Sequence, residues 1–419
     1  MNRTSIKTID LKSPAIRWLG IFVLLFLAVM AFYTFRWSFG YTLALRSQEL
    51  EHAQMAVELA PDAPQAHYSL FRQLDKTFIA ADSVRAIQEL ETATALSPHN
   101  YLLWLELGKA RERSGDIEGS EQALRRAAAL APNYASVQWA LGNMLLRSGR
   151  TDEAFQHIRT AVSSDTSFAA AAVISAFQAA GDDPQTARRW LGDSPPLLAE
   201  FAVLLVTQKR FADAEEVWRA LPKQNAEYAK ISPVGDTLAR YLLDAKQFRF
   251  AREVFMQNGS DLSDGIANGG FESAMKAAAG PFEWQIDAGN QPRIGPADGQ
   301  KHAGNFSLLV GFGEGTKEFR GVSQLVAVKP GETAFHIFYR ANMNGSRGKL
   351  RWEITDAATG RIIAATEPLS LNAEWQPAAV QFTVPAGTEA VTIRLARTEC
   401  PPTDCYFSGN VWFDDAEVK

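Results

Sequence analysis

The stretch YLLWLELGKARERSGDIEGSEQALRRAAALAP, residues 101–132, is one unit of a sequence that repeats about every 34 residues. Its end, Leu130-Ala131-Pro132, recurs upstream as Leu96-Ser97-Pro98 and as Leu59-Ala60-Pro61. Repeats of this length are pairs of helices, and each pair can bury its apolar stripe only against the next pair. We therefore predict an all-α array of helix pairs over residues 41–257.

The order of large and small residues within this unit is specific. A large residue, a Leu-Gly pair, a turn glycine, two packing residues and a terminal proline occur at Trp104, Leu107, Gly108, Gly115, Leu124, Ala127 and Pro132. This order resembles the tetratricopeptide repeat (TPR) family, and residues 135–166 repeat it. The resemblance implies a superhelical solenoid, with degenerate repeats after residue 181.

A TPR solenoid presents a concave groove lined by one face of each first helix, which suits an extended peptide or a partner helix. The candidate partner-binding residues at these positions are Tyr68, Arg72, Leu105, Lys109, Trp139 and Asn143. The alternative is that Leu105 and Trp139 only pack against neighbouring helices. The resemblance thus implies a protein partner in the groove.

An unbroken apolar run, WLGIFVLLFLAVMAFYTF, occupies residues 18–35 between Arg17 and Arg36. As a helix it would be about 27 Å long, close to the hydrocarbon thickness of a bilayer. We predict a transmembrane helix over residues 18–37 and a cytoplasmic tail over residues 1–17, because basic residues outnumber acids in that tail. The bulk of a single-pass bacterial inner-membrane protein would then be periplasmic. The alternative is a cleaved signal peptide.

Charge and motif content exclude several classes of function. The formal net charge is −5 with acids and bases interspersed, and no segment supplies the concentrated basic surface that nucleic-acid binding needs. The sequence lacks the HExxH, GxSxG and Walker motifs. We therefore expect no nucleic-acid partner and no enzymatic activity.

The two cysteines, Cys400 and Cys405, lie close together in the sequence ECPPTDC. We predict a local disulfide, which fits an oxidising compartment. A zinc site is the alternative, but it would need two more ligands, and neither His302 nor His336 is close in sequence.

The composition changes after Gly265, where alternating apolar and polar residues separated by Gly, Pro and Asn turns replace the helical periodicity. Apolar rows such as Leu350, Trp352 and Ile354 alternate with polar residues, so we assign Trp352 to a core. This pattern predicts an all-β, two-sheet sandwich over residues 264–419.

A series of short motifs, from Asn268-Gly-Gly-Phe-Glu272 at the start to Val411-Trp-Phe-Asp-Asp415 at the end, resembles CenC-type carbohydrate-binding modules. These modules are galactose-binding-like jelly rolls. The resemblance implies that the first and last strands lie side by side, with a structural calcium ion held there by Glu272 and Asp414 or Asp415. Because Asp415 alternates with Val411 and Phe413, we expect its side chain to point to the apolar side.

Sugar recognition combines aromatic faces with planar hydrogen-bonding groups, and the polar faces of the predicted strands offer both. The candidate ligand-binding residues are His336, Phe338, Arg340, Arg351, Glu353, Trp375, Gln381 and Arg394. The alternative is the polar outer face of any sandwich. The arginines favour an acidic polysaccharide.

These features together predict a multidomain chain with one transmembrane helix, an all-α TPR-like solenoid and an all-β jelly-roll sandwich. The function that fits is a noncatalytic, membrane-anchored periplasmic scaffold that couples protein binding to glycan binding, in envelope or extracellular polysaccharide assembly or export. The alternatives are a purely protein-binding scaffold whose sandwich does not bind sugar, and an accessory subunit of a glycan-modifying enzyme.

Overall fold

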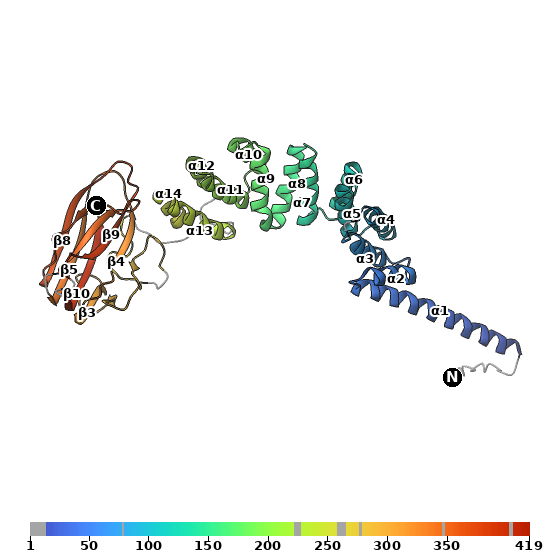
Figure 1. Ribbon diagram of the computed structural model, residues 1–419, viewed down its shortest axis with the longest axis horizontal. Coiled ribbons are helices and arrows are strands. Elements are labelled where there is room, and N and C mark those ends of the chain that lie inside the picture. The colour runs from blue at the N-terminus through green and yellow to red at the C-terminus, as the bar shows by residue number, and fades with distance from the viewer. Residues whose placement is uncertain are drawn as a thin grey trace, which may run out of the picture. The chain divides into compact units, whose positions relative to one another are not determined.

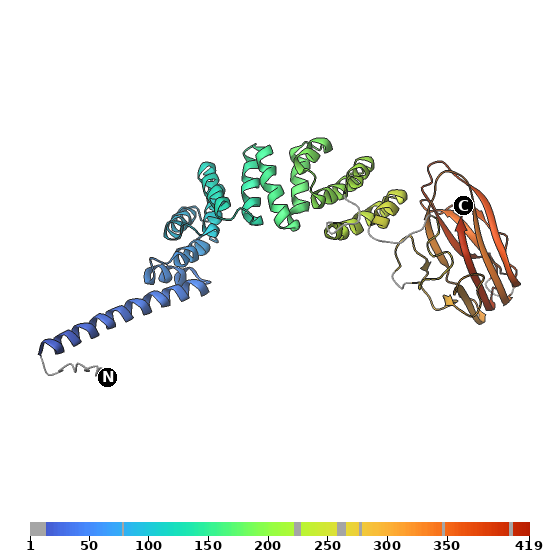
Figure 2. The same cartoon turned by 180° about the vertical axis from the view of Figure 1, so that it is seen from behind.

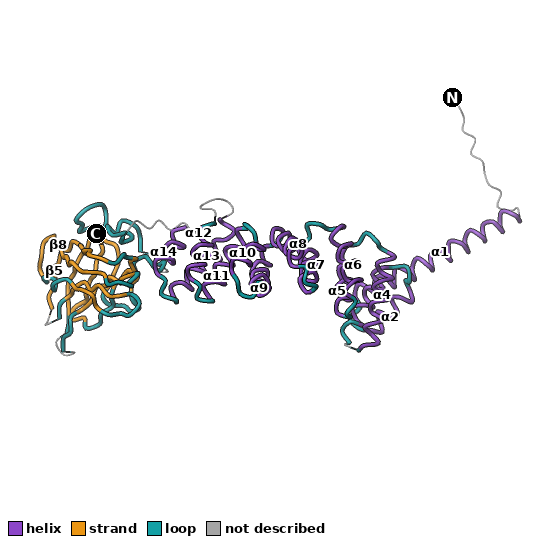
Figure 3. Tube along the Cα trace, turned by 90° about the horizontal axis from the view of Figure 1, so that it is seen from above, coloured by secondary structure: helices purple, strands orange, loops and turns teal. Residues whose placement is uncertain are grey.

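The computed structural model describes residues 14–77, 79–221, 228–257, 265–275, 279–345, 348–401 and 405–419. Most of the predicted cytoplasmic tail therefore lies outside the described residues. The chain forms two compact units, residues 1–197 and 198–419. Figure 1 labels the helices and strands described below. The domains predicted from the sequence, residues 41–257 and 264–419, are divided at a different place, where helices give way to strands. Figure 3 shows the helices in purple and the strands in orange.

The first unit is helical. Its elements are α1 (Pro14–Arg46), α2 (Leu50–Leu59), α3 (Pro64–Leu74), α4 (Ala80–Leu96), α5 (Tyr101–Arg113), α6 (Ile117–Leu130), α7 (Ala135–Arg147), α8 (Thr151–Ser164), the 3-10 turn η1 (Thr166–Phe168), α9 (Ala169–Ala179) and α10 (Pro184–Leu191). Helices α2, α4 and α6 end at Leu59, Leu96 and Leu130, as the repeated Pro motif predicts. Successive helices pack as antiparallel pairs, which can be followed from either side in Figures 1 and 2.

The side chain six residues after each motif proline binds back to that proline's carbonyl oxygen. His67 Nε2 lies 2.8 Å from Pro61 O, Trp104 Nε1 donates to Pro98 O at 3.0 Å, and Gln138 Nε2 donates to Pro132 O at 2.7 Å. Three different residue types thus satisfy the equivalent carbonyl group in the loop that follows each helix. The three loops are structurally equivalent.

Close approach of the helices within a pair requires glycine. A Cβ atom at Gly108 of α5 would lie 2.5 Å from Leu124 Cγ of α6, and one at Gly142 of α7 would lie 2.7 Å from Ile158 Cγ1 of α8. Gly115 has φ +87°, a conformation that glycine adopts at little cost, and ends α5. The glycine of the Leu-Gly pair in these two repeats therefore marks the point where the two helices of a pair approach closely.

The second unit begins with helices and ends with the sandwich. Its helices are α11 (Pro195–Thr207), which crosses the boundary between the units, α12 (Phe211–Arg219), α13 (Tyr228–Asp244) and α14 (Phe248–Gln257). Helices α13 and α14 are separate, because the chain turns between them at Lys246 with φ +60°.

Two five-stranded antiparallel sheets form the sandwich. The β9 sheet has the order β1 (Gln285–Ile286), β4 (Val322–Ala327), β9 (Ala390–Arg397), β6 (Leu350–Asp356), β7 (Ile362–Ala365). The β10 sheet has the order β2 (Arg293–Ala297), β3 (Ser307–Thr316), β10 (Phe407–Val418), β5 (Gly331–Gly345), β8 (Asn372–Val384). The two-sheet sandwich predicted from the alternation is confirmed.

Aromatic residues from both sheets fill the core between them. Trp352 is fully buried, as predicted, with its ring 5.2 Å from Phe413 and 5.7 Å from Phe335. The apolar rows of β6 and β9 face the same core. Their intervening residues, including Arg351, Glu353 and Arg394, are therefore placed on the outer face of the β9 sheet.

Candidate functional site

A groove of about 650 Å³ lies on the outer face of the β9 sheet. Its lining comes from β4, β6, β9 and the segments beside them: Asp287, Phe319, Gly321, Val322, Ser323, Arg351, Glu353, Ile362, Thr392, Arg394, Leu395, Ala396, Arg397 and Glu399. Strand register brings the central residues together, because Arg394 lies opposite Glu353 on one side and opposite Ser323 on the other. Three of the predicted ligand-binding residues therefore share one site.

Glu353 is the buried centre of this groove, with 4% of its surface exposed. Arg351 donates from Nε and Nη2 to Glu353 Oε1 at 3.0 and 2.6 Å, and Arg394 donates from the same two atoms to Oε2 at 3.0 and 2.8 Å. Burial acts to raise the pKa of Glu353, but the hydrogen bonds from the two arginines outweigh it, so the pKa lies below its ordinary value.

The two arginines are held in place but remain accessible. Their side chains are 34% and 49% exposed. Within the described part of the chain, no hydrogen-bond partner faces Nη1 of Arg351 or Arg394. Each guanidinium therefore presents a fixed, planar donor to the groove.

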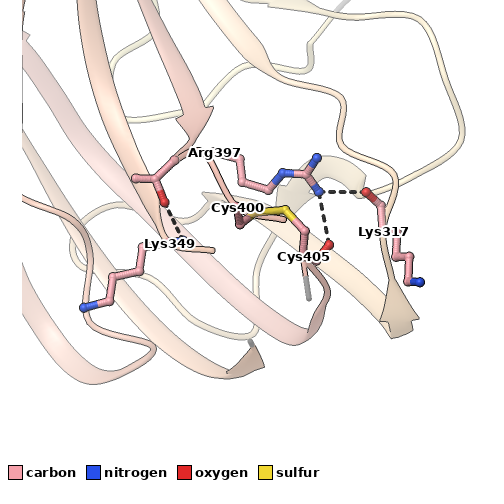
Figure 4. Close-up of a disulfide and its surroundings, with 6 residues drawn as sticks. Lys317, Lys349, Arg397, Cys400 and Cys405 are labelled. Atoms are coloured by element: carbon pink, nitrogen blue, oxygen red, sulfur yellow. Dashed lines mark hydrogen bonds between the residues drawn. A yellow bond between two sulfur atoms is a disulfide. The ribbon is translucent and has the colours of Figure 1, made fainter. Parts of the chain in front are cut away.

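Arg397 forms another wall of the groove and is fastened by the disulfide loop (Figure 4). Its Nη1 atom donates to Lys317 O at 2.7 Å and to Cys405 O at 3.4 Å, and its guanidinium lies 5.7 Å from the centre of the Phe319 ring. The disulfide between Cys400 and Cys405 confirms the pairing predicted from their spacing, and it occupies both sulfur atoms that a zinc site would need.

The other candidate ligand residues lie on the opposite sheet. On the outer face of the β10 sheet, the His302 ring stacks on Phe338 with centroids 3.9 Å apart, and Trp375 lies 5.7 Å from His302. Arg340 on the same face forms an ion pair with the exposed Glu374 at 3.1 Å. This aromatic cluster is separated from the Glu353 groove by the whole core.

His336 and Gln381 lie farther along this face, on β5 and β8. His336 is opposite Glu417 and Ala379, and Gln381 is opposite Ala334. The predicted ligand set is therefore divided between two outer faces. Sequence reasoning did not assign His302 or Phe319 to a ligand site, because both lie outside the alternating strands from which candidates were chosen.

The predicted metal ligands lie where the start and the end of the sandwich meet. Glu272 Oε1 accepts hydrogen bonds from Asn305 N at 2.7 Å and Phe306 N at 3.0 Å. Asp414 Oδ2 accepts from His302 N at 2.8 Å and Ala303 N at 3.1 Å. These oxygens already have donors, which is a poor fit to a calcium ligand set. Among the described residues, no group of three or more His, Cys, Asp or Glu is arranged to hold a metal ion. Calcium binding stays a prediction.

The prediction that Asp415 points to the apolar side is wrong. Asp414 is fully buried, whereas the side chain of Asp415 is 37% exposed and lies 2.7 Å from His302 Nδ1. The register of β10 shifts after Asp414, and Asp415 has φ +50°, so the alternation of the strand is interrupted there. Burial raises the pKa of Asp414 above its ordinary value.

The motif at the start of the sandwich meets β10 without forming a paired strand. Ala416 N donates to Gly269 O at 2.9 Å, and a Cβ atom at Gly269 would overlap Ala416 O. The two ends of the domain do lie together, as the resemblance implies, but the first partner is a turn.

The residues predicted to line the partner groove lie on α3, α5 and α7. A small cavity of about 120 Å³ lies between α3 and α5 and is lined by Tyr68 and Glu106 among others. Lys109 forms an ion pair with Glu106 at 2.9 Å, and Arg72 is exposed. Burial raises the pKa of Tyr68 above its ordinary value.

Leu105 does not belong to this surface. It is 3% exposed and packs in a core cluster with Val137 and Leu141 of the next unit, which confirms the alternative of helix packing. Trp139 is half-buried, with its ring 5.0 Å from Phe168, and its carbonyl oxygen accepts a hydrogen bond from the Asn143 amide.

Residues 81–135 and 105–167 match the family model of the tetratricopeptide repeat. Among solved structures, the chain is similar to a crystal structure of MamA, with 15% sequence identity and a TM-score of 0.28 over 41% of this chain and 83% of that chain. No curated protein matches the chain.

Two carbohydrate-binding modules are also similar to this chain. TmCBM61, solved in complex with β-1,4-galactotriose, has 14% identity and a TM-score of 0.28, covering 38% of this chain and 99% of that chain. A CBM4 structure has 21% identity and a TM-score of 0.28, covering 37% and 98%. The chain thus contains TPR units over residues 81–167, followed by a sandwich with the jelly-roll fold.

Proposed function

We propose that this protein is a noncatalytic scaffold whose sandwich binds a polysaccharide in the Glu353 groove, while its TPR array binds a protein partner. The observation that carries the proposal is the pair of arginines fixed by the buried carboxylate of Glu353. Their Nη1 groups, which have no hydrogen-bond partner within the described part of the chain, are planar donors suited to the hydroxyl and carboxylate oxygens of a sugar.

The rest of the groove supports a ligand rich in hydroxyl groups. Three cations, Arg351, Arg394 and Arg397, face three anions, Asp287, Glu353 and Glu399, so the lining offers both donors and acceptors. Phe319 supplies an aromatic ring beside them. A balanced lining of this kind favours hydrogen bonding over attraction of a single sign of charge.

Membrane anchoring belongs to the same proposal. Among the described residues, one helix, Ile16–Arg46 within α1, is long and apolar enough to cross a membrane, and its apolar part is not buried in the protein. A span there would hold the array and the sandwich at the periplasmic face of an inner membrane. The proposed role is then in assembly or export of an envelope or extracellular polysaccharide.

Glycan binding can be tested with the full chain in detergent micelles against an array of neutral and acidic polysaccharides. Arg394→Met should weaken binding at least tenfold, because it removes one fixed donor and leaves Glu353 paired with Arg351. The matched control is Arg340→Met on the opposite sheet, which should bind as the parent does.

Three other results would point to a different binding site or a different function. Loss of binding with Arg340→Met or Phe338→Ala, but not with Arg394→Met, would move the ligand site to the aromatic cluster of the β10 sheet. Binding to no polysaccharide by the folded chain would leave the protein-binding scaffold as the function. Recovery of a glycan-modifying enzyme by crosslinking would favour an accessory subunit.

A further inference from the structure

Helix α1 does not end where its apolar run ends. Residues 18–35 are exposed on all sides, whereas the helix continues without interruption to Arg46. Its last turns pack on the first hairpin of the array, where Ala44 and Tyr41 contact a cluster of buried alanines from α2, α3 and the loop between them. One helix therefore belongs both to the candidate membrane span and to the array.

The loop between α2 and α3 is fastened to α1 immediately after the apolar run. A Cβ atom at Gly40 would lie 2.8 Å from Leu59 Cβ and 3.0 Å from Ala60 N, so the two backbones are in close contact there. One turn earlier, Arg36 Nη2 donates to Glu58 O at 2.6 Å. The loop is thus held at the level of Arg36 to Gly40 on α1.

This attachment fixes the depth of the loop in a bilayer. At a rise of about 1.5 Å per residue, Gly40 lies roughly 7.5 Å beyond Phe35 along the helix. The headgroup layer on each side of a bilayer is roughly 5 to 8 Å thick. With the run at residues 18–35 in the hydrocarbon, the loop must lie in the headgroup layer. Trp37 lies on α1 at this depth and Tyr33 lies one turn before it, near the end of the run, and aromatic residues are enriched at this boundary of a membrane.

A groove of about 630 Å³ opens between α1 and this loop. It is lined by Met30, Tyr33, Thr34, Arg36, Trp37, Ser38, Leu59, Pro61 and Asp62. On α1 the lining runs from Met30 and Tyr33 in the apolar run to Arg36 just beyond it, and the loop adds Asp62. Apolar side chains next to a cation and an anion match the acyl chain, phosphate and amine of a zwitterionic phospholipid.

We propose that this groove seats a membrane phospholipid, so that the α2–α3 loop is a lipid-contacting surface. The headgroup lies against Arg36 and Asp62, and the upper acyl chain lies against Met30 and Tyr33. The inference rests on the membrane anchoring of the proposed function.

The repeat supplies matched positions for a test. Pro61, Pro98 and Pro132 are exposed and occupy equivalent loops, but only Pro61 lies beside α1. Full-length Pro61→Cys, Pro98→Cys, Pro132→Cys and Leu25→Cys variants would each be labelled with bimane and reconstituted into phosphatidylethanolamine and phosphatidylglycerol vesicles. Half of the vesicles would contain phosphatidylethanolamine brominated near the top of its acyl chains.

We expect brominated lipid to quench the Leu25 label and to reduce the Pro61 fluorescence at least twofold, with little effect at Pro98 and Pro132. Quenching at Leu25, with Pro61 no different from Pro98, would overturn the lipid-contact inference and leave the anchoring intact. No quenching at Leu25 would overturn the anchoring and the inference together. Melting temperatures matching the parent protein would show that the labelled chains are folded.

Discussion

Glu353 shows how a single carboxylate can organise a surface. Its side chain is nearly inaccessible, whereas those of its partners Arg351 and Arg394 are partly exposed to solvent. The two arginines therefore cover the carboxylate of Glu353, and the carboxylate in turn holds the arginines in place. Such an arrangement keeps long, flexible arginines in one conformation, which reduces the entropy lost when they bind a ligand.

Glu353→Gln should lower the free energy of unfolding of the sandwich by about 1 to 2 kcal/mol at neutral pH, a value reduced for the exposure of the arginines. Because the folded-state pKa of Glu353 is lowered, its contribution is present above its unfolded pKa of about 4.3 and is lost as the pH falls through the folded value. Hydrogen exchange of β6 and β9 at pH 7 and near pH 3 would measure the difference, which should shrink in acid.

The control is Glu374→Gln on the other sheet. Glu374 is 83% exposed in its ion pair with Arg340, so its loss should change stability little at either pH. An equal effect of the two substitutions on stability would contradict the stabilising role assigned to the buried carboxylate of Glu353.

At the scale of the element, the spacing of the paired helices depends on residues that have no side chain. Gly108 faces Leu124, which is fully buried and cannot move into solvent. Gly142 and Ile158 repeat this contact one unit later. Ion pairs between units follow the same period, as in Arg113 with Asp75 and Arg147 with Glu112.

Gly108→Ala should destabilise the array by about 1 kcal/mol. Alanine improves helix propensity by up to about 1 kcal/mol, but overpacking of a fixed core typically costs about 1 to 3 kcal/mol. Thermal unfolding followed by far-ultraviolet circular dichroism would measure the shift. Gly20→Ala is the control, because a Cβ atom there has no neighbour within 4 Å and should cost nothing. An increase in melting temperature for Gly108→Ala would mean that Leu124 can rearrange.

The elements that the sequence predicted well are those with local signals. Helix ends at Leu59, Leu96 and Leu130 follow from a proline nearby in the sequence, and the core position of Trp352 follows from alternation within one strand. The pairing of sheets is not local. Arg394 is 41 residues from Glu353, and nothing in either strand showed that they would be neighbours while Phe338 would face the opposite way.

An irregular turn accounts for one error, and packing between neighbouring units accounts for another. Because of the irregular turn at Asp415, Asp414 is buried and Asp415 is partly exposed, which is the reverse of what the alternation predicts. The alternation of residue types does not indicate such a turn. Leu105 was assigned to a groove by its position in the repeat, but the next helix pair covers it. How neighbouring units cover each other depends on packing between them, which a single repeat does not encode.

At the scale of the whole molecule, the orientation of the chain across a membrane follows from the distribution of charge around the apolar run. Basic residues before the run and few after it favour a cytoplasmic N-terminus. A C-terminal alkaline phosphatase fusion in a Gram-negative host should therefore be active, and a green fluorescent protein fusion at the same end should stay dark.

The opposite pattern would place the sandwich in the cytoplasm and would remove the proposed contact with envelope polysaccharide. As a control, the same reporters fused after Arg17 should give the reverse pattern. Release of the mature protein into the soluble periplasmic fraction would instead indicate a cleaved signal peptide.

The continuity of α1 from Pro14 to Arg46, with no proline after the first residue, has a mechanical consequence. A membrane thinner than the apolar run is accommodated when the helix tilts, at a cost of fractions of a kcal/mol per Å of mismatch. In an anchor with a flexible linker, that tilt would be absorbed at the joint. Here the same helix is bonded to the first hairpin through Arg36 and Gly40, so the tilt turns the hairpin with it. The tilt of α1, and with it the local bilayer thickness, would then set the direction in which the first helical units face.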